Sequence, residues 1–218
     1  MSTEPLIHLR GIERTFRLGG GEVRTLRGLD LDIHAGEMVG VMGTSGSGKS
    51  TFLNIVGLLD RPTAGEYRLG GEDTARLSDR ARADRRGREL GFVFQAFHLL
   101  PNATALENVA MPLIYGGGSH ERAGAALERV GLADRAKHRP GELSGGQQGR
   151  VAIARALVNN PQIILADEPT GALDERTGFE MLALFQALHA EGRTLVIVTH
   201  DEAVARCCGR ILRFRDGS

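Results

Sequence analysis

Two apolar patterns separate the strands that the sequence predicts. Residues 6–9 and 24–33 alternate apolar and polar side chains, as do strands of an antiparallel sheet with one solvated face. Residues 66–69 are expected to extend that sheet. Later segments are instead continuous apolar runs, typical of strands buried on both faces of a parallel sheet. These runs are residues 38–42, 91–94, 162–166 and 194–199.

Helices are predicted between the apolar runs, and one stretch of the chain is predicted to hold only helices. We therefore expect a single domain over residues 1–218, with a helical subdomain at 97–158 inserted into an α/β core formed by 1–96 and 159–218. The predicted helices are residues 51–59, 77–89, 103–111, 120–130, 134–138, 144–158 and 175–191, followed by a short helix after Asp201 and an edge strand at 211–214.

Charge is dense in the predicted helix at 77–89, but its signs are mixed. Asp79, Asp84 and Glu89 stand among arginines, which favours a solvated helix face over a nucleic-acid patch. The whole chain balances 27 basic against 27 acidic residues, so it offers no global field for nucleic acid or an anionic membrane. We therefore expect no nucleic-acid partner.

Other features of the sequence point to a cytosolic chain. No apolar run approaches the roughly 18 residues that a membrane span needs. The first residues lack the basic and apolar regions of a signal peptide. The two cysteines, Cys207 and Cys208, are adjacent, and we expect small, buried or half-buried thiols in a reducing compartment.

The stretch Gly43–Ser50 fits the phosphate-binding pattern G-x-x-x-x-G-K-[ST], between a predicted strand and a predicted helix. Glycines let the backbone curl until successive N–H groups meet phosphate oxygens, and the helix N-terminus adds positive charge there. Lys49 is expected to reach the β- and γ-phosphates, and the Ser50 hydroxyl to bind Mg²⁺. The expected phosphate-binding residues are Gly43, Thr44, Ser45, Gly46, Ser47, Gly48, Lys49, Ser50 and Thr51.

The lysine of this loop stands out against the composition of the chain. Only Lys49 and Lys137 are lysines among the 27 basic residues, so the other 25 are arginines. A guanidinium does not replace a compact ammonium at a phosphate loop, and Lys49 resists the arginine bias as that role requires.

Further polar residues follow the other predicted parallel strands: Gln95, Asp167 and His200. Because ligands bind at the carboxyl ends of parallel strands, we expect these residues and Gly43 to meet at one edge of the sheet. Asp167 is expected to share the Mg²⁺ shell with Ser50, as in other P-loop enzymes. Glu168, directly after it, can accept a proton from a water that attacks the γ-phosphate.

A second anion site is predicted at Leu143–Gln147, where a serine and two glycines open a helix. This segment, the phosphate loop, Gln95, residues 163–168, residues 171–174 and His200 resemble the motifs of ATP-binding cassette (ABC) ATPases in order and spacing. The resemblance covers nearly the whole chain. It implies a P-loop NTPase fold of the α/β class, with a RecA-like core, an antiparallel β subdomain and the inserted helical subdomain.

The resemblance also implies a head-to-tail dimer with a second copy of the chain. ATP on one phosphate loop would be closed over by Ser144, Gly145, Gly146 and Gln147 of the other copy. Gln95 would touch Mg²⁺ and the attacking water, His200 would contact the γ-phosphate, and Asp174 would link the two sites. Phe16 stands where such proteins stack an aromatic ring on adenine.

Within the family, residues 94–101, 106–113 and 166–174 look like the bacterial lipoprotein-release and macrolide-export group. The implied partner is an integral membrane transporter subunit, and the implied location is the cytoplasmic face of the inner membrane. Two alternatives remain: a regulatory membrane-associated ATPase of the cell-division type, and a soluble ABC ATPase without a transporter.

One residue departs from the family pattern. Position 149 holds Gly where the family normally has Gln or Arg. Gly inside a helix costs about 1 kcal/mol relative to Ala, so the sequence predicts that Gly149→Gln raises the melting temperature.

Overall fold

The structure is a computed structural model that describes residues 4–19, 21–116 and 119–217. The chain divides into two compact units, residues 1–83 with 196–218 (unit 1) and residues 84–195 (unit 2). Both parallel and antiparallel strand pairs are present, which confirms the predicted α/β class.

Unit 1 contains an antiparallel sheet in the order β2-β1-β4-β5. It is built on one long hairpin, and the strand at residues 64–69 joins it as expected. The first strand is much longer than the predicted 6–9, because register shifts beyond Leu9 and the positive φ of Gly11 (+57°) break the alternation. The strands are β1 (Ile7–Leu18), β2 (Gly21–Ile33), β4 (Ala64–Leu69) and β5 (Glu72–Asp73), followed by the short turn η1 (Thr74–Arg76).

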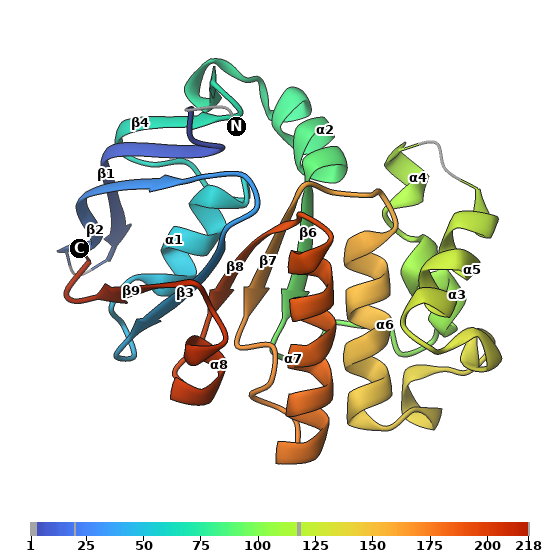
Figure 1. The fold of residues 1–218 in the computed structure, drawn as a ribbon. Helices are drawn as coiled ribbons and strands as arrows, with labels where there is room; N and C mark the ends of the chain where they lie inside the picture. Colours follow the sequence, from blue (N-terminus) through green and yellow to red (C-terminus); the bar gives the residue numbers. More distant parts are fainter. Residues whose placement is uncertain (1–3, 20, 117–118, 218) are drawn as a thin grey trace. The chain divides into compact units, whose positions relative to one another are not determined.

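The parallel strands of unit 1 are ordered β8-β3-β9; β8 and β3 are buried almost throughout, whereas only Phe214 of β9 is buried. Helix α1 lies between the antiparallel sheet and β3 (Figure 1). The hydroxyl of Tyr67 on β4 donates to Val56 O at the end of α1 (2.7 Å), which ties the helix to the sheet. The elements are β3 (Met38–Gly43), α1 (Lys49–Val56), β8 (Thr194–Val198, whose first two residues belong to unit 2), α8 (Glu202–Arg206) and β9 (Arg210–Phe214).

Unit 2 packs helices on the parallel pair β6–β7. Helix α6 lies on β6 and is flanked by α3, α5 and α7. The predicted helix at 134–138 is instead a single 3₁₀ turn, because Pro140 follows too closely for an α-helix to extend. The elements are β6 (Leu90–Phe94), α3 (Ala105–Ala110), α4 (Leu113–Gly116), α5 (His120–Arg129), η2 (Ala133–Arg135), η3 (Pro140–Glu142), α6 (Gly145–Leu157), β7 (Ile163–Asp167) and α7 (Glu175–Ala190).

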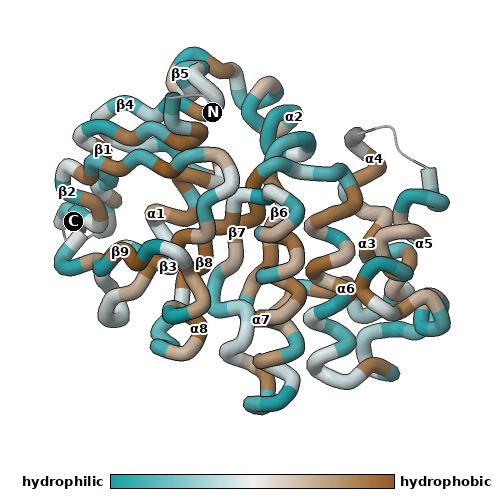
Figure 2. The backbone as a smooth tube through the Cα atoms, in the orientation of Figure 1, coloured by the Kyte–Doolittle hydropathy of each residue, from teal (hydrophilic) through white to brown (hydrophobic). Residues whose placement is uncertain are grey.

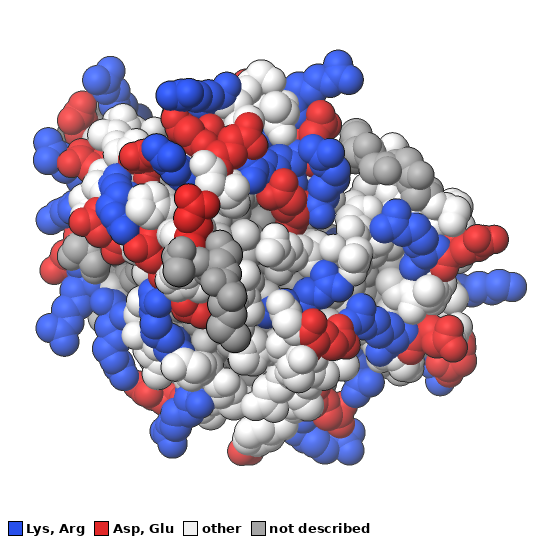
Figure 3. All heavy atoms as spheres, turned by 45° about the horizontal axis from the view of Figure 1, so that its top comes forward, with Lys and Arg blue, Asp and Glu red and all other residues white. Residues whose placement is uncertain are grey.

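Helix α2 (Asp79–Glu89) is hydrophilic along most of its length, as Figure 2 shows. Two of its arginines are nevertheless buried. Arg82 donates to the carbonyl of Asp60 in unit 1, and Arg85 pairs with Glu89 within unit 2 (3.0 Å). Acidic and basic side chains are interspersed over the face shown in Figure 3, in keeping with the mixed charge that the sequence predicts.

Three side chains refine the sequence-based picture of packing. Phe179 on α7 is 57% exposed, whereas Leu182, Phe185 and Leu188 on the same helix are buried. Cys207 and Cys208 are half-buried free thiols, as expected, and burial raises the pKa of Cys208 to about 11. Among the described residues, no helix combines the length and apolar character that a bilayer crossing requires.

The packing around Gly149 opposes the stabilisation that helix propensity predicts for Gly149→Gln, because the space beside this residue is filled. It is buried in α6, and a Cβ built there would lie 2.2 Å from Met181 Cε and 3.2 Å from the Phe97 ring. Overpacking a core costs about 1–3 kcal/mol, which exceeds the helix propensity gained. We therefore expect Gly149→Gln to lower the melting temperature and not to raise it.

Candidate functional site

The phosphate-binding loop joins β3 to α1 in unit 1, as the sequence predicts. Gly46 and Gly48 have φ of +78° and +98°, in the region that favours glycine. A Cβ on Gly48 would lie 2.4 Å from Thr25 O on β2, so only glycine lets the loop lie this close to the strand. Helix α1 then begins at Lys49, with no acidic residue in its first turn to oppose an anion.

Lys49 folds back over the loop that precedes it. Its Nζ donates to Gly43 O (2.7 Å) and to Thr44 O (2.8 Å), which holds the ammonium at the mouth of the loop. The Ser47 hydroxyl is buried and has no hydrogen-bond partner among the described residues. Ser50 is exposed and Thr51 half-buried in the first turn of the helix.

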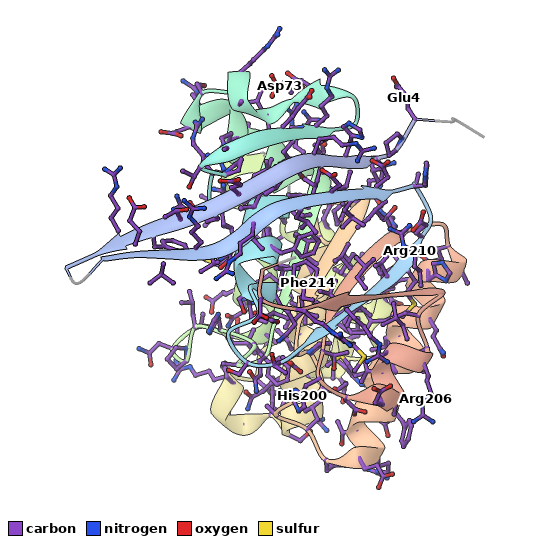
Figure 4. All side chains as sticks on the ribbon, turned by 90° about the vertical axis from the view of Figure 1, so that its left-hand side faces the viewer. Glu4, Asp73, His200, Arg206, Arg210 and Phe214 are labelled. Atoms are coloured by element: carbon purple, nitrogen blue, oxygen red, sulfur yellow. The ribbon has the colours of Figure 1, made fainter. Side chains whose placement is uncertain are left out.

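An open hollow of about 460 Å³ in unit 1 lies at the carboxyl end of β3. It brings together the start of the phosphate loop and His200, the residue predicted after β8. Figure 4 shows His200 on the loop that follows β8, below β9, whose ends carry Arg210 and Phe214. The lining residues are Met42, Gly43, Thr44, His200, Arg213, Phe214, Arg215 and Asp216.

Unit 2 brings Gln95, Asp167 and Glu168 together. Phe94 on β6 is the register partner of Asp167 on β7, so Gln95 and Glu168 leave the two strands side by side. Gly171 N donates to Glu168 O (3.0 Å), and a Cβ on Gly171 would lie 3.0 Å from the Gln95 amide nitrogen. An exposed amide therefore lies against the loop that follows the two carboxylates.

Glu168 has φ of +47°, a left-handed conformation that is uncommon for residues other than Gly, Asn and Asp. Such strain costs about 1–3 kcal/mol and clusters at functional sites. The sequence pattern located Glu168 but carried no signal for this backbone geometry.

Ser144 caps helix α6 through a reciprocal pair of hydrogen bonds. Gln147 N donates to Ser144 Oγ (3.3 Å), and Ser144 N donates to Gln147 Oε1 (2.9 Å). Thr177 packs closely against Gly146, because a Cβ on this glycine would lie 2.2 Å from Thr177 Cγ2. The cap and the close approach fix Gly145, Gly146 and their free backbone amides at the start of the helix.

Asp174 caps the neighbouring helix α7. Its carboxylate accepts from Thr177 N (3.0 Å) and from the Thr177 hydroxyl (2.7 Å). These two donors stabilise the ionised form and lower the pKa of Asp174 below its ordinary value. Because Thr177 also touches Gly146, it joins the predicted dimer-coupling residue to the predicted second anion site.

Sequence reasoning missed the arginines that brace these segments. Arg155, on the α6 helix that Ser144 opens, donates to Phe97 O (2.6 Å) and His98 O (2.8 Å), just after Gln95. Burial lowers the pKa of the Arg155 guanidinium. In unit 1, Arg14 lies over the ring of Phe16, which is half-buried on β1. No sequence pattern marks either arginine, because each contact is set by the folded structure and not by a local motif.

A family model described as ABC transporter matches residues 26–171. The ABC transporter ATP-binding protein YknY of Bacillus subtilis is 54% identical over 217 residues, covering 98% of this chain and 94% of that protein. The macrolide export ATP-binding/permease protein MacB of Syntrophobacter fumaroxidans is 54% identical over 219 residues, covering 97% of this chain. The chain spans 31% of that MacB, about a third of its length.

Two solved structures support the same assignment. Both are dimeric structures of the ATP-binding cassette MJ0796, one in a post-hydrolysis state bound to ADP and Pi. They match with a TM-score of 0.89 at 46% and 48% identity, over 97% of this chain and 95% of theirs. The P-loop fold predicted from the sequence is thereby confirmed. With matches of this extent and identity, the chain belongs to the ABC transporter family, as one of its ATP-binding cassettes.

Proposed function

We propose that the chain is the ATP-hydrolysing, nucleotide-binding subunit of a bacterial ABC transporter complex, and that ATP-driven dimerisation changes the conformation of a membrane partner. The observation that carries this proposal is the loop at Gly43–Ser50. It is curled by glycines, holds Lys49 at its mouth and opens onto the N-terminus of α1. In this family, a loop built in this way binds a nucleoside triphosphate.

The loop residues fit the phosphates of ATP, and three side chains have the donor chemistry for Mg²⁺. Ser50 supplies a hydroxyl, Gln95 an amide oxygen and Asp167 a carboxylate. Mg²⁺ keeps several waters and takes few protein ligands, so a dense acidic cluster is not required. When bound, the ion supplies charge neutralisation at the phosphate oxygens.

Roles for the remaining residues follow from their places. Glu168 is the proposed general base, and it is held beside Gln95 by the register of β6 and β7. His200 is the proposed γ-phosphate contact, since it lines the same hollow as Gly43. Phe16 on β1 is the proposed platform for the adenine ring, to which stacking contributes about 1–3 kcal/mol.

The site is proposed to be shared between two copies of the chain. The open amides at Gly145 and Gly146, together with Ser144 and Gln147, would close over ATP held by the partner copy. Asp174 would couple the two sites through Thr177. The dimeric state of the MJ0796 cassettes supports this arrangement.

The membrane partner and its cargo are also proposals. MacB of S. fumaroxidans is an ATP-binding/permease protein, and this chain matches about a third of it. We infer an integral membrane transporter partner, engaged through a helical subdomain at 97–158 inserted into the 1–96/159–218 core. The chain would then work peripherally at the cytoplasmic face of the inner membrane, driving export or extraction of lipoprotein- or macrolide-type molecules.

The test is Glu168→Gln in the purified chain. Removing the base should lower the rate of Mg²⁺-dependent ATP hydrolysis by about 100-fold or more, because general-base catalysis contributes a rate enhancement of that size. ATP should then hold the variant as a dimer in size-exclusion chromatography. Glu128→Gln, at an exposed position on α5, is the matched control and should hydrolyse ATP at the wild-type rate. Wild-type hydrolysis by Glu168→Gln would rule out the assigned base.

A further inference from the structure

Arg14 is placed against the proposed adenine platform. Its guanidinium carbon lies 4.3 Å from the centroid of the Phe16 ring, within the range of a cation–π contact. The Arg14 side chain is 23% exposed, so the contact is partly shielded from water. One face of the Phe16 ring is therefore covered by a cation.

Asp60 fixes the orientation of that guanidinium. Arg14 Nε donates to Asp60 Oδ2 (2.8 Å) and Arg14 Nη2 donates to Asp60 Oδ1 (2.9 Å). This bidentate pair uses one edge of the planar group and leaves its face free to lie over a ring. Asp60 is anchored in turn, because its backbone N–H donates to Asn54 O in α1 (3.1 Å).

Strand β1 is also linked to the phosphate loop through Thr25 on β2. The Thr25 hydroxyl donates to Arg14 O (3.1 Å), and Thr25 O lies where a Cβ on Gly48 would clash at 2.4 Å. Arg14 is thus connected to the start of α1 through Thr25 and to its end through Asp60. Both connections lie within unit 1.

We propose that Asp60 and Arg14 are positioning residues that hold the Phe16 ring as a platform for adenine, with the base stacking on the face opposite Arg14. This inference rests on the proposed function. The cation draws electron density toward its own side of the ring, which makes the opposite face a better partner for an electron-rich purine. Holding the ring in one orientation also lowers the ordering cost of binding.

The stack contacts the face of the base and none of its edges. It should therefore strengthen binding of purine nucleotides in general and leave binding of a bare triphosphate unchanged. This distinction separates a positioning role from a merely structural one, since a damaged fold would weaken the binding of both ligands.

The experiment compares the affinities of ATP and inorganic tripolyphosphate by titration calorimetry without Mg²⁺, so that hydrolysis does not interfere. Arg14→Met should weaken ATP binding by about three- to tenfold, because the base stack on Phe16 is weakened but not abolished, with tripolyphosphate binding unchanged. Arg17→Met is the matched control, because Arg17 is an arginine on the same strand that is 89% exposed and forms an ion pair with exposed Glu22. It should leave both affinities at the wild-type values.

Two further variants make the test independent of an unpaired charge or a folding defect. Arg14→Met/Asp60→Asn removes both charges and should match Arg14→Met alone, because both residues act through one stack. In a Phe16→Ala background, Arg14→Met should have no further effect on ATP affinity.

Three results would overturn the inference: unchanged or tighter ATP binding by Arg14→Met, equal weakening of ATP and tripolyphosphate, or an undiminished Arg14→Met effect without the Phe16 ring. Tighter binding in particular would mean that Arg14 covers the face the base needs. If the wild-type chain binds neither ligand, the proposed function fails and the inference fails with it.

Discussion

Glu168 keeps a carboxylate on a backbone that disfavours it. Its φ of +47° costs a residue with a Cβ about 1–2 kcal/mol, whereas glycine adopts this conformation freely. We expect Glu168→Gly to be more stable to unfolding than Glu168→Ala by about 0.5–1 kcal/mol, after allowing for the greater freedom of glycine in the unfolded chain. Both variants lack the carboxylate, so the difference in their stability reports on the backbone conformation at this position.

Urea unfolding followed by circular dichroism would measure that difference. Glu180, inside helix α7, is the control position. There the Glu180→Gly variant should be less stable to unfolding than Glu180→Ala by about 1 kcal/mol. A lower stability of Glu168→Gly than of Glu168→Ala would show that no strain is stored at this residue. The expected order would mean that the chain retains Glu168 for its chemistry, at a cost in stability.

At the residue scale, the sequence located chemistry better than geometry. Lys49, Glu168 and Ser144 were found because each stands at a fixed offset from glycines or from an apolar strand. The contact between Arg14 and Asp60 joins residues 46 positions apart and leaves no local pattern. These two residues are brought together by the packing of the loop after α1 against β1, which single-sequence periodicity does not report.

Helix α6 shows how tertiary packing overrides propensity. Met181 Cε and the Phe97 ring occupy the space beside Gly149, so a side chain there must displace them. We expect Gly149→Ala and Gly149→Gln to lower the free energy of unfolding, the glutamine variant by about 1–3 kcal/mol. Met181→Ala in the same chain should recover part of that loss, since it empties the space that the new side chain needs.

Thermal or urea unfolding of the two single variants and the double variant gives the coupling free energy. Met181→Ala alone should cost about 2–5 kcal/mol, as other buried methionines do. The double variant Gly149→Gln/Met181→Ala should then be more stable than the sum of the two losses predicts. Strict additivity would mean that Met181 does not fill the space beside Gly149, and a stabilised Gly149→Gln would restore the propensity argument.

Among whole elements, apolar pattern predicted best where burial is complete. The runs at β7 and β8 are buried along their length, and their positions were predicted within one residue at each end. Strand β1 was underestimated because a bulge interrupts its alternation, so that the local pattern ends before the strand does.

At the scale of the whole molecule, the phosphate loop is proposed to be half of a site. In a two-fold dimer, each site would combine Lys49 of one copy with Ser144 of the other. A chain with Lys49→Met lacks a working loop, and a chain with Ser144→Arg lacks a working cap, so each alone should be inactive. Mixed together, they form heterodimers in which one site pairs the intact loop with the intact cap and the other site has neither.

Mixing the two inactive chains should therefore restore ATP hydrolysis. With random pairing, about half of the dimers are heterodimers with one intact site of two, so the mixture should reach about a quarter of wild-type activity if one site suffices. A mixture of Lys49→Met with Lys49→Met/Ser144→Arg has no intact loop and serves as the control that should stay inactive. If each site were built within one chain, no mixture would recover, because every chain would carry its own defect. Recovery in the first mixture alone would assign Ser144 to the partner's nucleotide.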